Sequence, residues 1–203
     1  MDKIFGKIKD FYKKSEDVII PAAVLIIICI VVTLALSSTN LLTRGPIAEI
    51  TAKNNRAAME KVLKAESYTE SSLQTEDGEF AYNIAANGSE TLGYIFITSA
   101  KGYGGDVGVM TAIGTDGKVI AVEILDVSNE TPGLGQNATK PDFYKQFVGM
   151  TDKTQVVKNG ADPSNSQIDA LTGATITSRA VSNAVNEAIV LSKDIINKGG
   201  EAQ

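Results

Sequence analysis

The segment Asp169–Ser178 (DALTGATITS) has the residues best suited to hold a phosphate group. Thr172 and Thr175 bracket a Gly-Ala pair, so little side-chain bulk would keep a phosphate from the backbone. A stretch with helical periodicity follows, and backbone N–H groups at the start of a helix favour an anion. A phosphate esterified to a hydroxyl here would be well placed. Ser and Thr are also the preferred helix caps, so a plain cap with a glycine turn is the simpler interpretation of this segment alone.

Two other segments have unusual composition for their length. Glu130–Gly135 (ETPGLG) combines one rigid residue, two flexible ones and a protruding leucine, which by itself indicates an ordered loop. Lys101–Gly105 (KGYGG) lies between two β-like runs. Its glycines permit close backbone approach and Tyr103 could stack on a flat group, although a glycine-rich β-connection is the commoner interpretation.

Residue types that the chain lacks exclude several kinds of chemistry. There is no histidine, which removes Ser-His-Asp and Cys-His hydrolytic arrangements. Cys29 is the single cysteine, so the chain alone cannot form a disulfide, a Cys-rich zinc site or an iron–sulfur cluster. A carboxylate-based hydrolase and an oxygen-ligated metal site remain open, but we expect no metal and a chemistry supplied by a cofactor.

The charge of the chain is unevenly distributed. Residues 1–17 hold five Lys and four acidic residues, whereas residues 37–203 hold 14 basic and 20 acidic residues. Non-specific nucleic-acid binding depends on Lys and Arg that neutralise phosphates. The acidic main part therefore argues against a nucleic-acid partner.

Val18–Leu36 is a run of 19 residues without a charge, and a helix of that length matches the hydrocarbon core of a bilayer. Five lysines precede it, while Arg44 is the single basic residue among the 15 residues after it. The positive-inside rule then places residues 1–17 in the cytoplasm as a basic tail and the rest outside. A cleaved signal peptide, with Ala35 and Ser37 as cleavage-site residues, is the alternative, but the apolar run is longer than such peptides usually have.

The part after this span is predicted to be one α+β domain. Residues 37–46 form a polar connector closed by a Gly-Pro helix breaker, and a helix is expected from there to about Ala65. Another helix is expected over 178–198, from its apolar spacing. Between them, FYKQFVGM suggests a short helix, and four runs read as strands, namely FAYNIAA, LGYIFITSA, VGVMTAI and KVIAVEIL. Residues 47–203 thus predict a mainly antiparallel sheet flanked by helices.

Taken together and in this order, the three segments resemble the FMN-binding domain. That domain occurs in the G subunit of the Rnf electron-transport complex, a ferredoxin:NAD oxidoreductase, and in the C subunit of the sodium-translocating NADH:quinone reductase. The resemblance covers the whole chain: basic tail, single span, helix, GYGG-type strand pair with a D-G-K turn, ETPGLG, and the D-x-x-[ST]-G-A-T flavinylation motif.

The resemblance implies a role for each motif. Thr175 would carry FMN through a phosphoester, attached by a flavin transferase that recognises Asp169, Thr172, Gly173 and Ala174. The flavin ring would lie beside Glu130, Thr131, Pro132, Gly133, Leu134 and Gly135. One departure is visible, because family members often have a histidine two residues before this glutamate, where this chain has Ser128.

The implied function is electron transfer. The chain would be a single-pass protein of a bacterial or archaeal cell membrane. It would relay electrons between other membrane and iron–sulfur subunits of an Rnf-type complex that moves Na⁺ or H⁺, with little activity alone. The compact chain favours the Rnf-type subunit over the quinone-reductase subunit, which remains an alternative. Two others are an anchored binding module without flavin and an independent extracellular flavin reductase.

Overall fold

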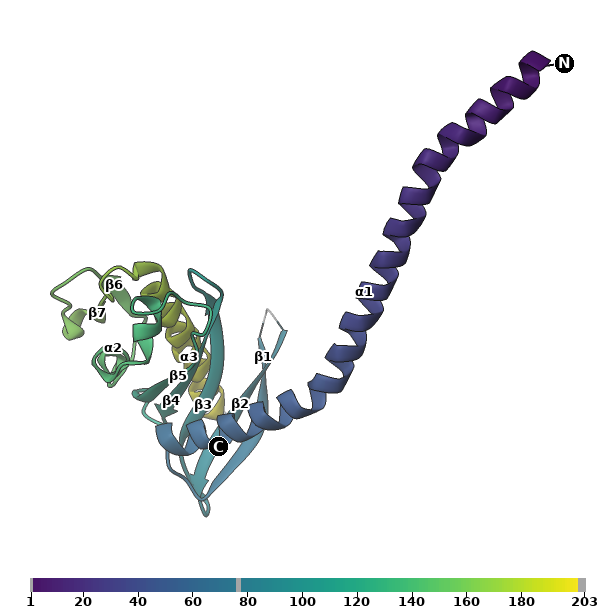
Figure 1. Cartoon of the computed structure of the whole chain (residues 1–203). Helices are drawn as coiled ribbons and strands as arrows, with labels where there is room; N and C mark the ends of the chain where they lie inside the picture. The colour runs from purple at the N-terminus through teal and green to yellow at the C-terminus, as the bar shows by residue number, and fades with distance from the viewer. Residues whose placement is uncertain (1, 76–77, 201–203) are drawn as a thin grey trace. The chain divides into compact units, whose positions relative to one another are not determined.

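The structure is a computed structural model that describes residues 2–75 and 78–200, with side chains from residue 19 to residue 197. It divides into two compact units, Met1–Lys53 and Asn54–Gln203. Helix α1, Asp2–Val62, makes up the first unit and enters the second (Figure 1).

The predicted helix break at residues 37–46 is wrong, because α1 continues through it, with Gly45 and Pro46 inside the helix. The polar residues fit a helix because their hydroxyls donate back to carbonyl oxygens of the preceding turn, as Ser38 does to Leu34 at 2.8 Å and Thr39 to Ala35 at 2.9 Å. The use of this stretch as the connector outside the membrane stays a prediction.

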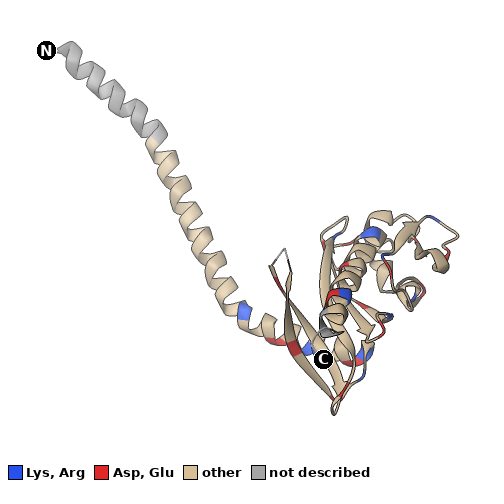
Figure 2. Cartoon of the chain, turned by 180° about the vertical axis from the view of Figure 1, so that it is seen from behind, with Lys and Arg blue, Asp and Glu red and all other residues tan. Residues whose placement is uncertain are grey.

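The apolar part of α1 is long and apolar enough to cross a membrane. The side chains of residues 19–36 are exposed, and Figure 2 shows no charged residue on the ribbon of this stretch. An exposed helix of this composition needs an apolar surrounding, since exposed hydrocarbon in water is unfavourable.

Five strands form one antiparallel sheet in sequence order. They are β1 (Ser67–Thr75), β2 (Gly78–Asn87), β3 (Glu90–Lys101), β4 (Asp106–Gly114) and β5 (Val119–Asp126). The four predicted runs are confirmed as β2 to β5. The β4–β5 turn is closed by a 2.9 Å hydrogen bond from Gly117 N–H to Gly114 O, and Gly117 has the positive φ (79°) that such turns require of glycine.

Strand β1 was not predicted from the sequence. It is an edge strand with mostly exposed Ser, Thr and Glu side chains, and Leu73 is its one buried residue among the described positions. A strand with one buried apolar side chain gives almost no period-2 signal, so its position is evident only from its pairing with β2.

The two faces of the sheet pack against different helices. Successive residues of a strand point to opposite faces, so Phe96 joins the core beneath α3 (Thr175–Gly200), while Ile95 packs with Ala58, Met59 and Val62 at the end of α1. The predicted helices flanking an antiparallel sheet are therefore confirmed.

Short elements connect β5 to α3. In chain order they are η1 (Gly135–Thr139), α2 (Pro141–Tyr144), η2 (Lys145–Phe147), β6 (Gln155–Val157), η3 (Pro163–Asn165) and β7 (Gln167–Asp169). The short helix expected at FYKQFVGM corresponds to α2 and η2, and the parallel pair of β6 and β7 was not predicted. Helix α3 begins at Thr175, three residues before the predicted start, because the turn before it ends at Ala174.

Candidate functional site

The three segments singled out in the sequence meet at one pocket of about 560 Å³. It lies where the β3–β4 loop, the chain after β5 and the first turn of α3 come together. Its lining residues are Tyr103, Glu130, Thr131, Leu134, Gly135, Gly173, Ala174, Thr175, Ile176 and Thr177. Most of the residues expected beside the ring are therefore assembled, whereas Pro132 and Gly133 are not among the lining residues.

Glu130 joins these segments through its carboxyl group. The side chain is 3% exposed, and its two oxygens accept hydrogen bonds from different parts of the chain. Oε1 accepts from Gly104 N–H at 2.9 Å, and Oε2 accepts from the Thr177 hydroxyl at 2.5 Å. One buried side chain thus links the loop after β3 to helix α3.

The glycines of the β3–β4 loop are needed for this close packing. A Cβ at Gly104 would lie 1.8 Å from the Asn129 carbonyl oxygen, and one at Gly102 would lie 2.4 Å from Glu130 Oε1. Gly102 N–H also donates to Gly105 O at 2.8 Å, which closes the loop. Tyr103 is left 72% exposed at the rim of the pocket.

The ETPGLG segment folds into a turn that presents its leucine. Leu134 N–H donates to Thr131 O at 3.1 Å, and Gly133 has a φ of 76°, in the region that favours glycine. Leu134 is 42% exposed and covers Gly173, where a Cβ would lie 3.0 Å from Leu134 Cδ2. The leucine therefore packs on the turn that precedes Thr175.

Thr175 is the first residue of α3 and its side chain is half-buried. The turn before it is held by a 3.0 Å bond from Ala174 N–H to Leu171 O and by a φ of 75° at Gly173. Ser178 reinforces it, since its hydroxyl oxygen accepts from Leu171 N–H and the hydroxyl donates to Ala174 O, both at 2.9 Å. The first N–H groups of a helix have no partner within the helix.

Thr175 also lines a second, smaller pocket of about 190 Å³, with Lys158, Asn159, Ala170, Leu171, Thr172 and Gly173. Thr172 reaches only this smaller pocket, whereas Gly173 and Thr175 line both. A lysine and helix N–H groups suit an anion, and the larger pocket with its tyrosine, leucine and isoleucine suits a flat ring. A molecule with a phosphate at one end and a ring at the other would fit across Thr175.

Asp169 lines neither pocket. It ends β7, and its Oδ1 accepts from Ala161 N–H at 3.0 Å. Its backbone N–H donates to Gln146 Oε1 at 2.7 Å. The structure therefore gives Asp169 a local role in ordering the chain before the turn, and its recognition by a transferase stays a prediction.

Ser128, at the place where family members often have histidine, is exposed and does not line the pocket. Its backbone N–H donates to Asp126 Oδ1 at 2.8 Å and holds the pKa of that carboxyl below its ordinary value. In this chain Ser128 therefore stabilises the turn after β5 through its bond to Asp126.

Sequence reasoning did not assign Ile176 or Thr177 to the site. Thr177 is 1% exposed and its hydroxyl meets Glu130, while Ile176 is 52% exposed at the rim. The spacing of Thr175 and Thr177 in the chain gives no sign of this contact, because the partner carboxyl lies 47 residues away.

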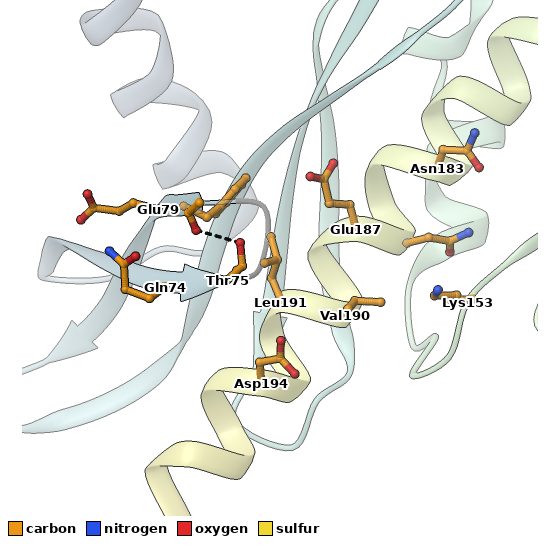
Figure 3. Close-up of a pocket in the computed structure, with 12 residues that line it drawn as sticks. Gln74, Thr75, Glu79, Lys153, Asn183, Glu187, Val190, Leu191 and Asp194 are labelled. Atoms are coloured by element: carbon orange, nitrogen blue, oxygen red, sulfur yellow. Dashed lines mark hydrogen bonds between the residues drawn. The ribbon is translucent and has the colours of Figure 1, made fainter.

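A third pocket, of about 740 Å³, is separate from the larger and the smaller pocket at Thr175 and lies between the β1–β2 hairpin and α3 (Figure 3). Its lining includes three acidic residues, Glu79, Glu187 and Asp194, and one basic residue, Lys153. Such a lining opposes a phosphate, and none of its described residues belongs to the three segments. It is not the candidate site.

The packing of the β3–β4 loop gives a prediction for stability. We expect Gly104→Ala to lower the free energy of unfolding by roughly 1–3 kcal/mol, as overpacking of a filled site does. The matched control is Gly108→Ala, whose Cβ would meet its nearest atom at 3.6 Å. Urea unfolding of the full chain in detergent, followed by near-UV circular dichroism, measures both, and equal stability of the two variants would contradict the prediction.

The sequence of this chain is similar to those of known proteins. Residues 102–190 match the FMN-binding domain family. The G subunit of the proton-translocating ferredoxin:NAD⁺ oxidoreductase complex of Clostridium ljungdahlii is 43% identical over 114 residues, which cover 56% of this chain and 60% of that protein. The G subunit of the Na⁺-translocating ferredoxin:NAD⁺ oxidoreductase complex of Acetobacterium woodii is 34% identical over 182 residues, which cover 82% of this chain and 87% of that protein.

A solved structure has the same fold. The crystal structure of Shewanella oneidensis NqrC superposes with a TM-score of 0.53 at 20% identity, over 66% of this chain and 70% of that chain. The matched domain includes the residues that form the larger pocket. Because relatives named as G subunits match most of its length, the chain belongs to the FMN-binding-domain family of G subunits of ion-translocating oxidoreductase complexes.

Proposed function

We propose that this chain carries FMN, joined through a phosphoester to Thr175, as the G-type subunit of a membrane-bound ferredoxin:NAD⁺ oxidoreductase complex. The observation that carries the proposal is the position of Thr175, half-buried at the start of α3 and lining both pockets. The names of the relatives support the complex, and the matched family supports the cofactor.

The residues around Thr175 suit the two ends of FMN. The phosphate would lie in the smaller pocket, near Lys158 and the first N–H groups of α3. The ring would lie in the larger pocket, against Tyr103, Leu134 and Ile176. When bound, FMN supplies the redox chemistry, and the chain positions it and sets its surroundings.

The complex would supply the electron donor and acceptor. Tyr103, Leu134 and Ile176 are 72%, 42% and 52% exposed, so the rim is open to a neighbouring redox centre. The apolar part of α1 would anchor the chain in the membrane with residues 1–17 in the cytoplasm and the domain outside. Other membrane and iron–sulfur subunits are the proposed partners, Na⁺ or H⁺ is the coupling ion, and a flavin transferase attaches FMN. We expect little activity from the chain alone.

The first test replaces the attachment residue. After co-expression with a flavin transferase, we expect the intact chain to gain the mass of FMN less one water and to fluoresce in a denaturing gel. Thr175→Ala should lose both signals completely, because alanine has no oxygen to form the ester. Thr139→Ala, at an exposed threonine outside both pockets, is the control and should keep them. If wild type carries no adduct despite an active transferase, a binding module without flavin becomes the leading function.

The role of Asp169 in attachment can be separated from its local contact. Asp169→Asn keeps an oxygen that can accept from Ala161 N–H but removes the charge. We expect the variant to fold as wild type does and to show a several-fold lower adduct fraction by intact mass. An undiminished adduct fraction would show that the charge of Asp169 has no part in attachment.

Membrane orientation can be read from cysteine labelling. In a Cys29→Ser background, which removes the single native cysteine, a membrane-impermeant maleimide should label Ser89→Cys in the exposed β2–β3 turn of intact cells. The matched variant Ser15→Cys, before the span, should be labelled only after lysis. The reverse pattern would invert the proposed topology.

A further inference from the structure

Glu130 is a buried titratable group that the proposed attachment of FMN does not use. It is 3% exposed and still lines the larger pocket. Both its oxygens accept hydrogen bonds, from Gly104 N–H at 2.9 Å and from the Thr177 hydroxyl at 2.5 Å. A carboxylate has no proton to donate and accepts at both oxygens, so the two contacts fit the ionised group.

No cation balances this carboxyl group among the described residues, since the ion pairs found there all involve other acids. Both donors are neutral groups. Burial of a carboxylate without a cation is costly and is sustained only where hydrogen bonds satisfy its oxygens. The site therefore keeps a buried acidic group that is stabilised by neutral donors alone.

The surrounding chain is built around this carboxyl group. A Cβ at Gly102 would lie 2.4 Å from Oε1, and a Cβ at Gly135 would lie 2.5 Å from Oε2. Two separate segments thus have a glycine beside the carboxyl group, one next to each oxygen. Such a close fit fixes the position of the carboxyl group relative to the pocket.

We propose that Glu130 is a positioning residue that joins the β3–β4 loop to the first turn of α3. Its carboxylate places a fixed negative charge against the larger pocket, and this charge lowers the reduction potential of a flavin held there. The proposal rests on the proposed function for the location of the ring. Reduction adds electron density to the ring, and a nearby negative charge in a partly desolvated pocket opposes this addition more strongly than it would in water.

Two substitutions separate the negative charge of Glu130 from the clamp, which is the hydrogen-bonded bridge that its side chain makes between Gly104 and Thr177. Glu130→Gln has the same shape, and its amide oxygen can still accept from Gly104 N–H while its NH₂ group donates to the Thr177 hydroxyl oxygen. Glu130→Ala removes the side-chain bridge altogether. Glu90→Gln, at the exposed start of β3, removes a charge that does not line the pocket and is the matched control.

The charge is tested on the full-length flavinylated chain in detergent, with the adduct first verified by intact mass. Spectroelectrochemical titration should give a more positive midpoint potential for Glu130→Gln than for wild type, and an unchanged one for Glu90→Gln. A Glu130→Gln variant that carries the adduct and titrates at the wild-type potential would overturn the electrostatic role.

The clamp is tested without flavin, in the Thr175→Ala background. There Glu130→Gln should unfold at about the urea concentration of its parent, and Glu130→Ala well below it. Equal unfolding midpoints for all three would overturn the clamp. Absence of adduct from wild type would count against the proposed function and against the effect on flavin, while the unfolding measurements would still decide the clamp.

Discussion

The assembly of the site depends on the burial of one carboxyl group. Glu130 follows the sheet in sequence, Gly104 belongs to the β3–β4 loop, and Thr177 belongs to α3. A buried carboxyl that loses one of its donors costs more than an ordinary hydrogen bond contributes, because the group remains out of water. The three segments are thereby coupled, and the pocket exists only where the sheet and α3 are packed together.

That packing sets the position of Thr175. Ala180, Ala184 and Ala188 face the sheet from α3 and are buried, and these small side chains let the helix approach closely. The Thr98 hydroxyl donates to Ala184 O at 2.9 Å, which fixes the helix along its axis with respect to β3. Since α3 starts at Thr175, the same contacts that build the core bring this hydroxyl to the edge of both pockets.

Sequence reasoning found the parts of the fold that have strong local signals. Strands β2 to β5 are runs rich in apolar residues, and α3 has helical periodicity, so both were predicted. Strand β1 and the β6–β7 pair have few buried apolar residues, and the Gly-Pro pair in α1 predicts a break where the helix continues. The motifs at the site were recognised by resemblance, but the contact of Thr177 with Glu130 is a tertiary contact between distant residues that no local spacing reveals.

The openness of the larger pocket gives the proposed phosphoester a physical purpose. Well-formed ligand sites bury most of the ligand surface, whereas this pocket has three large side chains that are strongly exposed at its rim. A ring held in such a pocket gains little from burial and would exchange with solvent if contacts alone retained it. A covalent bond at Thr175 would retain the cofactor without closing the rim, so the ring edge would stay accessible to a neighbouring redox centre. An electron carrier within an assembly needs both properties: a cofactor that cannot leave, and a ring edge that a partner can approach.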